Sequence, residues 1–256
     1  MEKFLTILVK SAKHLFFEEH QFLEHKSPND ILSEADLQLN EFFVNAIKKE
    51  YPKANIIAEE SKNGPLTNGL TFVIDPLDGT CNYAHKIPLC GIQIAVLKKK
   101  EPIISIIYLP YFDEFYLAKK GEGAYLNDKK ITVDKSIKHN DGVLLLSDYY
   151  LENKEVPYNK QYTLTKNLKL DFLKTRLLGA ACVDYAYLAT SKAAAYICYY
   201  DNIWDVAPGL LLVQEAGLLT RRVNGKPFKL GNHSLVVANN QETLDLILNK
   251  AKKKQR

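Results

Sequence analysis

Ile74-Asp75-Pro76-Leu77-Asp78-Gly79-Thr80 is the most informative stretch of this 256-residue chain. It follows apolar residues that indicate a short buried strand over residues 70–74. Pro76 lacks a backbone N–H and keeps Asp75 extended, so we expect the chain to leave the sheet at Asp75. Asp78 follows soon after, close enough for both carboxylates to face one point. The stretch therefore predicts two acids presented together at the end of a strand.

Two carboxylates held this close repel each other unless one is protonated or cations lie between them. Their hard oxygen atoms favour Mg²⁺ over zinc as the cation. Gly79 permits close backbone approach, and the N–H groups of Gly79 and Thr80, at the start of an expected helix, can hold phosphate oxygens. Asp-Pro and Asp-Gly are also ordinary turn dipeptides, so the stretch taken alone fits a simple loop equally well.

Acids stand at the ends of further expected elements. Glu59 follows an expected strand over residues 54–58, where a charged, solvated strand exit is the alternative explanation. Asp205 precedes an expected helix over residues 206–215, where the alternative makes it the N-cap, with Pro208 in the first turn. Together with the acids of the first stretch, they would form a four-carboxylate cluster able to hold roughly two or three Mg²⁺ ions. Such a cluster binds phosphate, activates water and stabilises the leaving oxygen, which predicts hydrolysis of a phosphate ester.

The composition is that of an ordinary globular protein, with 46% hydrophobic and 25% charged residues. Lys and Arg exceed Asp and Glu by 34 to 30, a surplus too small to indicate a nucleic-acid binder. No apolar run is long enough for a membrane-spanning helix, and residues 4–9 are too few for a signal sequence, which predicts a cytoplasmic protein. The cysteines at 81, 90, 182 and 198 lack metal-binding spacing and are expected to be buried thiols without disulfides.

Periodicity predicts an N-terminal α+β half, residues 1–140, with an antiparallel sheet and most of the metal ligands. Helices are expected at residues 5–16 and from a capping box at Ser33 and Asp36 to Pro52. The expected strands of this half are residues 54–58, 70–74, 92–97, 103–108 and 115–118. Residues 141–256 alternate strands and helices and would form a C-terminal α/β half that contributes Asp205. Its expected elements are strands at 143–146, 195–199, 218–220 and 234–238 and helices at 179–191 and 206–215.

Three separated motifs resemble those of the inositol monophosphatase family, within the wider group that includes fructose-1,6-bisphosphatase. They are Ala58-Glu59-Glu60-Ser61, the stretch from Asp75 to Thr80 with its tail Asn82-Tyr83-Ala84-His85, and Trp204-Asp205-Val206-Ala207 with Glu215-Ala216-Gly217. Their order and spacing fit, and weaker similarity covers roughly residues 1–240. The resemblance implies a layered αβαβα sandwich of the sugar-phosphatase type. It also implies a Mg²⁺-dependent, lithium-sensitive phosphatase that is usually a homodimer.

The resemblance implies a role for each acid. Glu59, Asp75 and the carbonyl of Leu77 would hold the metal ion that activates water. Asp75, Asp78 and Asp205 would hold a second ion near the leaving-group oxygen, and Glu59 would help to bind a third. Asp78 and Asp205 would also contact the alcohol part of the substrate.

Other implied roles concern water, phosphate and substrate. Thr80, supported by Asp36, would position the attacking water, and Gly79 and Thr80 would bind phosphate. The backbone of Ala181 would face the alcohol part of the substrate, so the C-terminal half would contribute to substrate binding. Asp36 is also the expected capping residue of its helix, and both roles can hold together.

Several residues depart from the family pattern. Cys198 stands where inositol-hydrolysing relatives have a Glu that binds ring hydroxyls, and a thiol cannot replace that acceptor. Ala180 stands where Ser is usual, and Cys81 replaces a second Thr. The tail from Cys81 to Pro88 resembles the monophosphatase form rather than the Lys-Glu-Phe form of the nucleotide bisphosphatases. The metal-binding residues thus look complete, while inositol recognition looks altered.

The sequence therefore predicts a Mg²⁺-dependent phosphatase for a small phosphorylated alcohol, such as an inositol, sugar, glycerol or histidinol phosphate. A 3′-phosphate nucleotidase is an alternative enzyme. A second hypothesis is a partner-binding protein, because some bacterial relatives serve transcription antitermination and ribosome maturation through a protein partner. Direct contact with nucleic acid or with a membrane is not expected.

Overall fold

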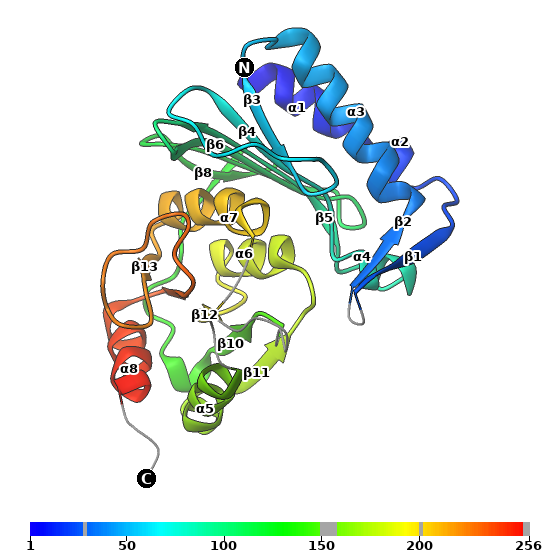
Figure 1. Ribbon diagram of the computed structural model, residues 1–256. Helices are drawn as coiled ribbons and strands as arrows, with labels where there is room; N and C mark the ends of the chain where they lie inside the picture. Colours follow the sequence, from blue (N-terminus) through cyan, green and yellow to red (C-terminus); the bar gives the residue numbers. More distant parts are fainter. Residues whose placement is uncertain (28–29, 149–157, 200–201, 253–256) are drawn as a thin grey trace.

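The computed structural model describes residues 1–27, 30–148, 158–199 and 202–252, which form alternating layers of helices and sheets (Figure 1). In order from one side to the other, the helical layers are α1 (Glu2–Ser11), α2 (Lys13–Phe16) and α3 (Glu34–Glu50), then α6 (Ala181–Ala189) and α7 (Ile203–Glu215), then α5 (Tyr158–Leu168) and α8 (Gln241–Lys252). A seven-stranded sheet separates the first layer from the second, and a five-stranded sheet separates the second from the third. This arrangement confirms the predicted layered αβαβα sandwich.

The seven-stranded sheet is almost entirely antiparallel. Its strands in spatial order are β3 (Asn55–Ala58), β4 (Thr71–Asp78), β5 (Gly91–Lys98), β6 (Glu101–Leu109), β7 (Glu114–Lys119), β8 (Gly123–Leu126) and β9 (Lys129–Ile131). Only β3 and β4 are parallel. The expected strands of this half are confirmed, whereas the short β8 and β9 were not predicted, because few β-branched or aromatic residues mark them.

β4 does not end at Asp75, as the sequence predicts, but continues to Asp78. Asp75 lies opposite Gln93 and Asp78 lies opposite Gly91, so β4 has one residue more than β5 over this interval. Residues three apart on a regular strand point to opposite faces, and this one-residue bulge returns Asp78 to the face of Asp75. Pro76 is tolerated here because the bulge already interrupts the ladder of hydrogen bonds between the strands, so that the missing N–H of Pro76 removes none of them.

The five-stranded sheet belongs to the second half of the chain. Its strands in spatial order are β11 (Lys174–Leu177), β10 (Val143–Leu146), β12 (Ala195–Cys198), β14 (Leu235–Ala238) and β13 (Leu219–Arg221). The first two pairings are parallel and the last two antiparallel, so the sheet is mixed. The expected strands are confirmed, and β11, α5 and α8 are additional elements.

Short elements complete the fold. An antiparallel hairpin, β1 (Phe22–Ser27) with β2 (Asp30–Ser33), lies in a polar stretch that gave no strand pattern. The helix expected at Thr80 is α4 (Thr80–Ala84), and a 3₁₀ turn η1 (His139–Asp141) precedes the second sheet.

The two sheets meet through the middle helical layer. α7 comes from the second half of the chain but packs on the sheet of the first half, where the hydroxyl of Ser105 on β6 donates to the carbonyl of Pro208. Gly209 lets α7 approach α6, because a Cβ at this position would lie 1.9 Å from Cδ2 of Tyr185. Since this layer is shared, the division at residue 140 stays a prediction.

The cysteines form no disulfide in the part of the chain that the structure describes. Cys90, Cys182 and Cys198 are buried, as expected. Cys81 is exposed, contrary to the prediction, because it lies in the short helix α4, where Thr80 is the only buried residue. Across the described ranges, no helix has both the length and the apolar character needed to cross a bilayer.

Candidate metal centre

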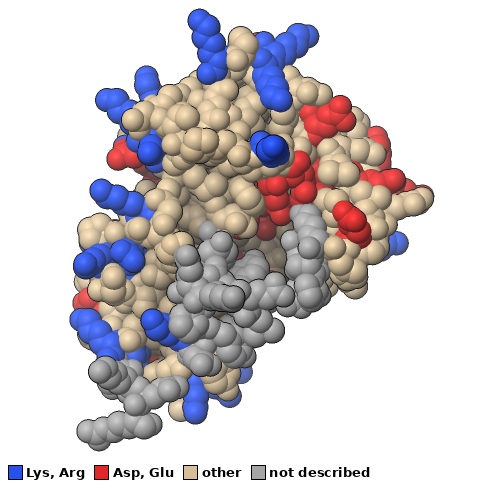
Figure 2. All heavy atoms as spheres, viewed as in Figure 1, with Lys and Arg blue, Asp and Glu red and all other residues tan. Residues whose placement is uncertain are grey.

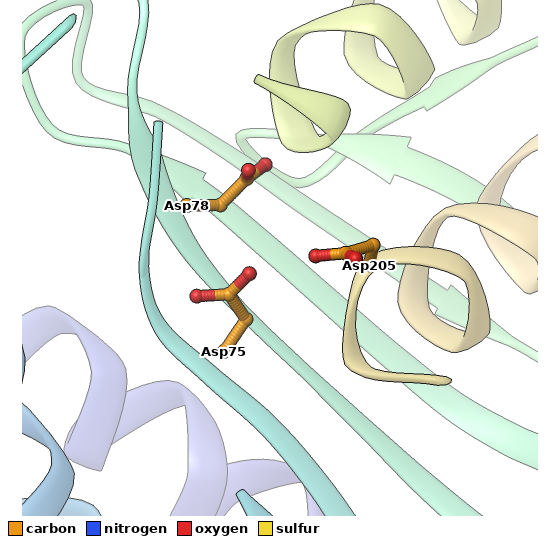
Figure 3. Close-up of side chains that lie close together, drawn as sticks. All are labelled: Asp75, Asp78 and Asp205. Atoms are coloured by element: carbon orange, nitrogen blue, oxygen red, sulfur yellow. The ribbon is translucent and has the colours of Figure 1, made fainter. Parts of the chain in front are cut away.

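Asp75, Asp78 and Asp205 come together at the boundary between the seven-stranded sheet and the middle helices. Asp75 and Asp78 extend from the bulged end of β4, and Asp205 extends toward them from the first turn of α7 (Figure 3). One carboxylate oxygen from each lies within 4.8 Å of the others. Asp75 and Asp78 are buried, with 1% and 9% of their surface exposed, and Asp205 is half-buried. Sequence positions far apart therefore supply one acidic group.

Asp75 is the most enclosed of these acids. Its Oδ1 accepts a hydrogen bond from the N–H of Leu77 at 3.2 Å, and its Oδ2 accepts one from Nε2 of Gln93 at 3.4 Å. Burial raises the pKa of Asp75 well above its ordinary value, and the charges of Glu59, Asp78 and Asp205 raise it further. A divalent cation among these carboxylates would remove that cost.

Asp78 links the sheet to α6. Its Oδ2 accepts hydrogen bonds from the backbone N–H of Cys182 and, at 3.3 Å, from Nε2 of Gln93. Burial raises the pKa of Asp78, hydrogen bonds from Cys182 and from the backbone of Ala181 lower it, and the charge of Asp148 raises it. The first turn of α6 therefore stabilises the ionised form of Asp78, as helix N-termini do for anions.

Glu59 lies at the exit of β3, beside β4. Its backbone N–H donates to the carbonyl of Ile74 at 3.2 Å, which continues the pairing of the two strands. This contact places the backbone of Glu59 beside Ile74, and the charge of Glu59 raises the pKa of Asp75. Among the described residues, Glu59 nevertheless lies outside the group whose oxygens are within 4.8 Å.

Thr80 and Asp36 are in direct contact. The hydroxyl of Thr80 lies 2.9 Å from Oδ1 of Asp36 and 3.1 Å from the carbonyl oxygen of Leu77, with both as acceptors. Oδ2 of Asp36 accepts from the N–H and the hydroxyl of Ser33, which forms the predicted capping box of α3. The buried carboxylate of Asp36 thus caps the start of α3 and orients the hydroxyl of Thr80.

Gly79 allows two remote segments to meet. Its φ is 85°, in the left-handed region, and a Cβ there would lie 2.9 Å from Cβ of Ala180 and 2.9 Å from the carbonyl of Leu89. Nearby, Nδ2 of Asn82 donates to the carbonyls of Leu89 and Leu178, both at 2.7 Å. These contacts place the start of α6 beside the bulge of β4.

One interpretation of the sequence made Asp205 the N-cap of its helix, and the structure shows that it is not. α7 begins at Ile203 and Asn202 is the N-cap, while Asp205 is the third helical residue and its Oδ2 accepts from the N–H of Asn202 at 2.9 Å. In a capping box the side chain at this position accepts from the backbone N–H of the N-cap residue, which is the role of Asp205 here. Pro208 accordingly lies deeper, inside the helix.

An open pocket adjoins the acidic group on the side of the second half. Acidic side chains gather beside the hollow on this face of the molecule (Figure 2). Ala181, expected to face the alcohol part of a substrate, lines the pocket, whereas Cys198 is buried in β12 and is not among the lining residues that the structure describes. The described residues that line the pocket are Asp78, Ser147, Asp148, Gly179, Ala180, Ala181, Asp184, Tyr196 and Asp205.

Several residues of this site were not predicted from the sequence. Gln93 is a lone amide within an apolar strand, and that contrast was its available signal. Ser147 and Asp148 directly follow a predicted strand, so they carried the same signal as Glu59. Asp184 and Tyr196 lie within ordinary apolar elements, so no pattern in the sequence indicated that they belong to the site.

The residues present fit a divalent cation. Buried carboxylate oxygens are hard ligands, and the raised pKa of Asp75 marks a place where negative charge lacks compensation. The sequence predicted Glu59, Asp75, Asp78 and Asp205 as one cluster. The structure brings Asp75, Asp78 and Asp205 into one group and places Glu59 near Asp75.

Comparison with known proteins gives concordant results. The model of the inositol monophosphatase family matches residues 3–256. Inositol-1-monophosphatase of Bacillus subtilis is 31% identical over 222 residues, which cover 85% of this chain and 82% of that protein. Nus factor SuhB of Pasteurella multocida is 33% identical over 216 residues, covering 83% and 79%. The crystal structure of extragenic suppressor protein suhB from Bartonella henselae matches with a TM-score of 0.90 and 25% identity, covering 99% of both chains.

Proposed function

The chain belongs to the inositol monophosphatase family, and from this premise we propose that it hydrolyses the phosphate ester of a small alcohol with the help of Mg²⁺. The observation that carries the proposal is the convergence of Asp75, Asp78 and Asp205 to within 4.8 Å. These carboxylates would hold a cation, which would supply the charge that binds the phosphate, makes water a better nucleophile and stabilises the leaving oxygen. Glu59 and the carbonyl of Leu77 complete the proposed ligands for roughly two or three ions.

Thr80 and Asp36 would position the attacking water. Because the Thr80 hydroxyl donates its hydrogen to Oδ1 of Asp36 or to the Leu77 carbonyl, its oxygen is left to accept a hydrogen bond from water. Asp36 is fixed by Ser33 and can hold the hydroxyl in that orientation. General acid–base positioning of this kind contributes about 10²–10⁴-fold to rate.

The phosphate and the alcohol would lie on either side of the acidic group. The backbone at Gly79 and Thr80 is proposed to bind phosphate oxygens. Asp78, Asp205 and Ala181 line the neighbouring pocket, where the alcohol part would lie. The pocket is open and several of its lining residues are polar, which suits a hydroxylated alcohol such as glycerol, a sugar or an inositol.

Recognition of inositol is expected to be weaker than in relatives that have Glu at the position of Cys198. Losing one hydrogen-bond acceptor for a diol costs about 1–3 kcal/mol, or roughly tenfold to a hundredfold in preference. Sugar, glycerol and histidinol phosphates are therefore proposed substrates alongside inositol phosphate. A nucleotide 3′-phosphate is a further candidate. The homodimer, lithium inhibition and a cytoplasmic location also remain predictions.

A panel of these phosphate esters with purified protein tests the proposal. Phosphate release should require Mg²⁺, fall with lithium, and disappear in Asp78→Asn while the folding transition is kept. Asp245→Asn, an exposed residue of α8, is the matched control and should retain full turnover. Absence of release from every ester, or turnover by Asp78→Asn, would refute the assignment.

A role in transcription is the second candidate function, and the similarity to the Nus factor SuhB of Pasteurella multocida favours it. Partner binding should not need the cation site. Binding of purified antitermination factors by both wild type and Asp78→Asn would support this role, and failure of both to bind would exclude it. The two functions can coexist in one protein.

A further inference from the structure

Gln93 is a polar residue in an otherwise apolar strand. It lies on β5, has no exposed surface, and stands between Asp75 on β4 and Ile107 on β6 in the register of the sheet. Its chain neighbours Ile92 and Ile94 are buried in the core on the other face. Sheet packing alone would favour an apolar side chain of the same size here, because burying an amide costs free energy.

The amide of Gln93 joins the acids of β4. Its Nε2 lies 3.4 Å from Oδ2 of Asp75 and 3.3 Å from Oδ2 of Asp78, so one NH₂ group donates to both carboxylates. Its Oε1 is buried and has no hydrogen-bond partner among the described residues. A half-satisfied buried amide lowers stability, so the fold retains a costly group whose described contacts are both with the acidic cluster.

We propose that Gln93 is a positioning residue for the cation site, an inference that rests on the proposed metal-dependent function. The two N–H groups on its single amide nitrogen donate to Oδ2 of Asp75 and to Oδ2 of Asp78. The spacing of two mutually repelling carboxylates is thereby set before a cation arrives. The bulge brings these acids to one face of β4, and Gln93 keeps their side chains together there.

The bulge and Gln93 act on the same pair for a geometric reason. Gln93 lies opposite Asp75, and Gly91, two residues earlier on the same face of β5, lies opposite Asp78. Because the bulge returns Asp78 to the face of Asp75, Gln93 can reach both acids from one position. Groups that orient metal ligands in this way typically change metal affinity about 10–100-fold when removed.

Calorimetric titration of Mg²⁺ into EDTA-treated, dialysed protein, without substrate, tests this inference. Gln93→Leu keeps the approximate volume and removes the amide. We expect its Mg²⁺ dissociation constant to rise about tenfold or more, and the Mg²⁺-induced increase in melting temperature to shrink. Where Mg²⁺ is made saturating, KM for the ester should stay near wild type, and only the Mg²⁺ concentration for half-activation should shift.

Thr71→Val is the matched control, because it also replaces a fully buried polar residue of the β4–β5 pair with an apolar one of similar shape. It should bind Mg²⁺ like the wild type. Gln93→Met, a longer and more flexible side chain, serves if Gln93→Leu does not unfold cooperatively. A folded Gln93→Leu or Gln93→Met protein with wild-type Mg²⁺ affinity would overturn the proposal. Absence of Mg²⁺ binding by the wild type would instead overturn the proposed function and this inference with it.

Discussion

Replacing Asp75 with Asn should stabilise the cation-free protein, although it removes a proposed metal ligand. The pKa of Asp75 is raised in the folded state, so the folded protein binds a proton there more readily than the unfolded chain. Stability without a cation therefore falls as pH rises from the ordinary value of 3.8 through the raised pKa, and the loss is complete at higher pH. Asn carries no charge and avoids this loss.

Burial is the largest cause of the raised pKa of Asp75, and the charges of the neighbouring acids add to it. Two unit charges 4.8 Å apart, the upper limit of the spacing between the carboxylate oxygens, repel by about 3.5 kcal/mol at an effective dielectric constant of about 20. Asp75 takes part in two such pairs, but protonation at about pH 8 limits the cost to about 6 kcal/mol. Lost charge-assisted hydrogen bonds from Leu77 and Gln93 offset about 2–4 kcal/mol. We expect a net gain of about 2–4 kcal/mol, or about 4–16 °C in melting temperature.

Thermal unfolding in EDTA and in Mg²⁺, between about pH 5 and pH 8, measures both sides of this prediction. Asp75→Asn should melt higher than wild type in EDTA at the upper pH, and the difference should narrow toward the lower pH. Mg²⁺ should raise the melting temperature of wild type only. Asp36→Asn is the contrasting control: this equally buried acid accepts hydrogen bonds from Ser33 and Thr80, so its loss should destabilise by about 1–3 kcal/mol. A destabilised Asp75→Asn in EDTA at pH 8 would refute the reasoning.

Three further outcomes test the geometry. Thr80→Val should lower kcat about 10²-fold without changing Mg²⁺ affinity in calorimetry, and Thr80→Ser should restore it; equal loss in Ser and Val would exclude the hydroxyl as the cause. Gly79→Ala, with φ at 85° and its new Cβ 2.9 Å from Ala180, should cost about 1–3 kcal/mol in urea unfolding, whereas a neutral result would contradict the close approach. Gly209→Ala should cost about 3 kcal/mol or more, because its Cβ would overlap the ring of Tyr185; unchanged stability would show that α7 can shift freely.

The sequence predicted the parts of this fold that strong local patterns specify. The apolar runs of the large sheet, the alternation after residue 140 and the capping box at Ser33 and Asp36 all appear in the structure. The hairpin β1–β2 and the strands β8 and β9 escaped prediction, since their residues are polar or few. Pairing with neighbouring strands stabilises such strands, and the local sequence pattern does not reveal that pairing.

The acidic site was predictable in its members and less so in its construction. An acidic residue at the end of an expected strand or at the start of an expected helix was the pattern that identified Glu59, Asp75, Asp78 and Asp205. Nothing in the spacing of Asp75 and Asp78 revealed that β4 continues through a bulge. Gln93 is recognisable only once β5 is placed beside that bulge. Local chemistry thus identified ligands, while the residues that arrange them required the register of the sheet.

Because α7 docks on the first sheet, the site has a consequence for biosynthesis. A ribosome completes β4 long before it reaches Asp205, so a nascent or truncated chain carries two of the three acids and lacks the helix that brings the third. Tight capture of a divalent ion should therefore mark chains whose second half has been synthesised and folded. Resistance to a protease in the presence of Mg²⁺ would then distinguish complete, folded chains from truncated ones.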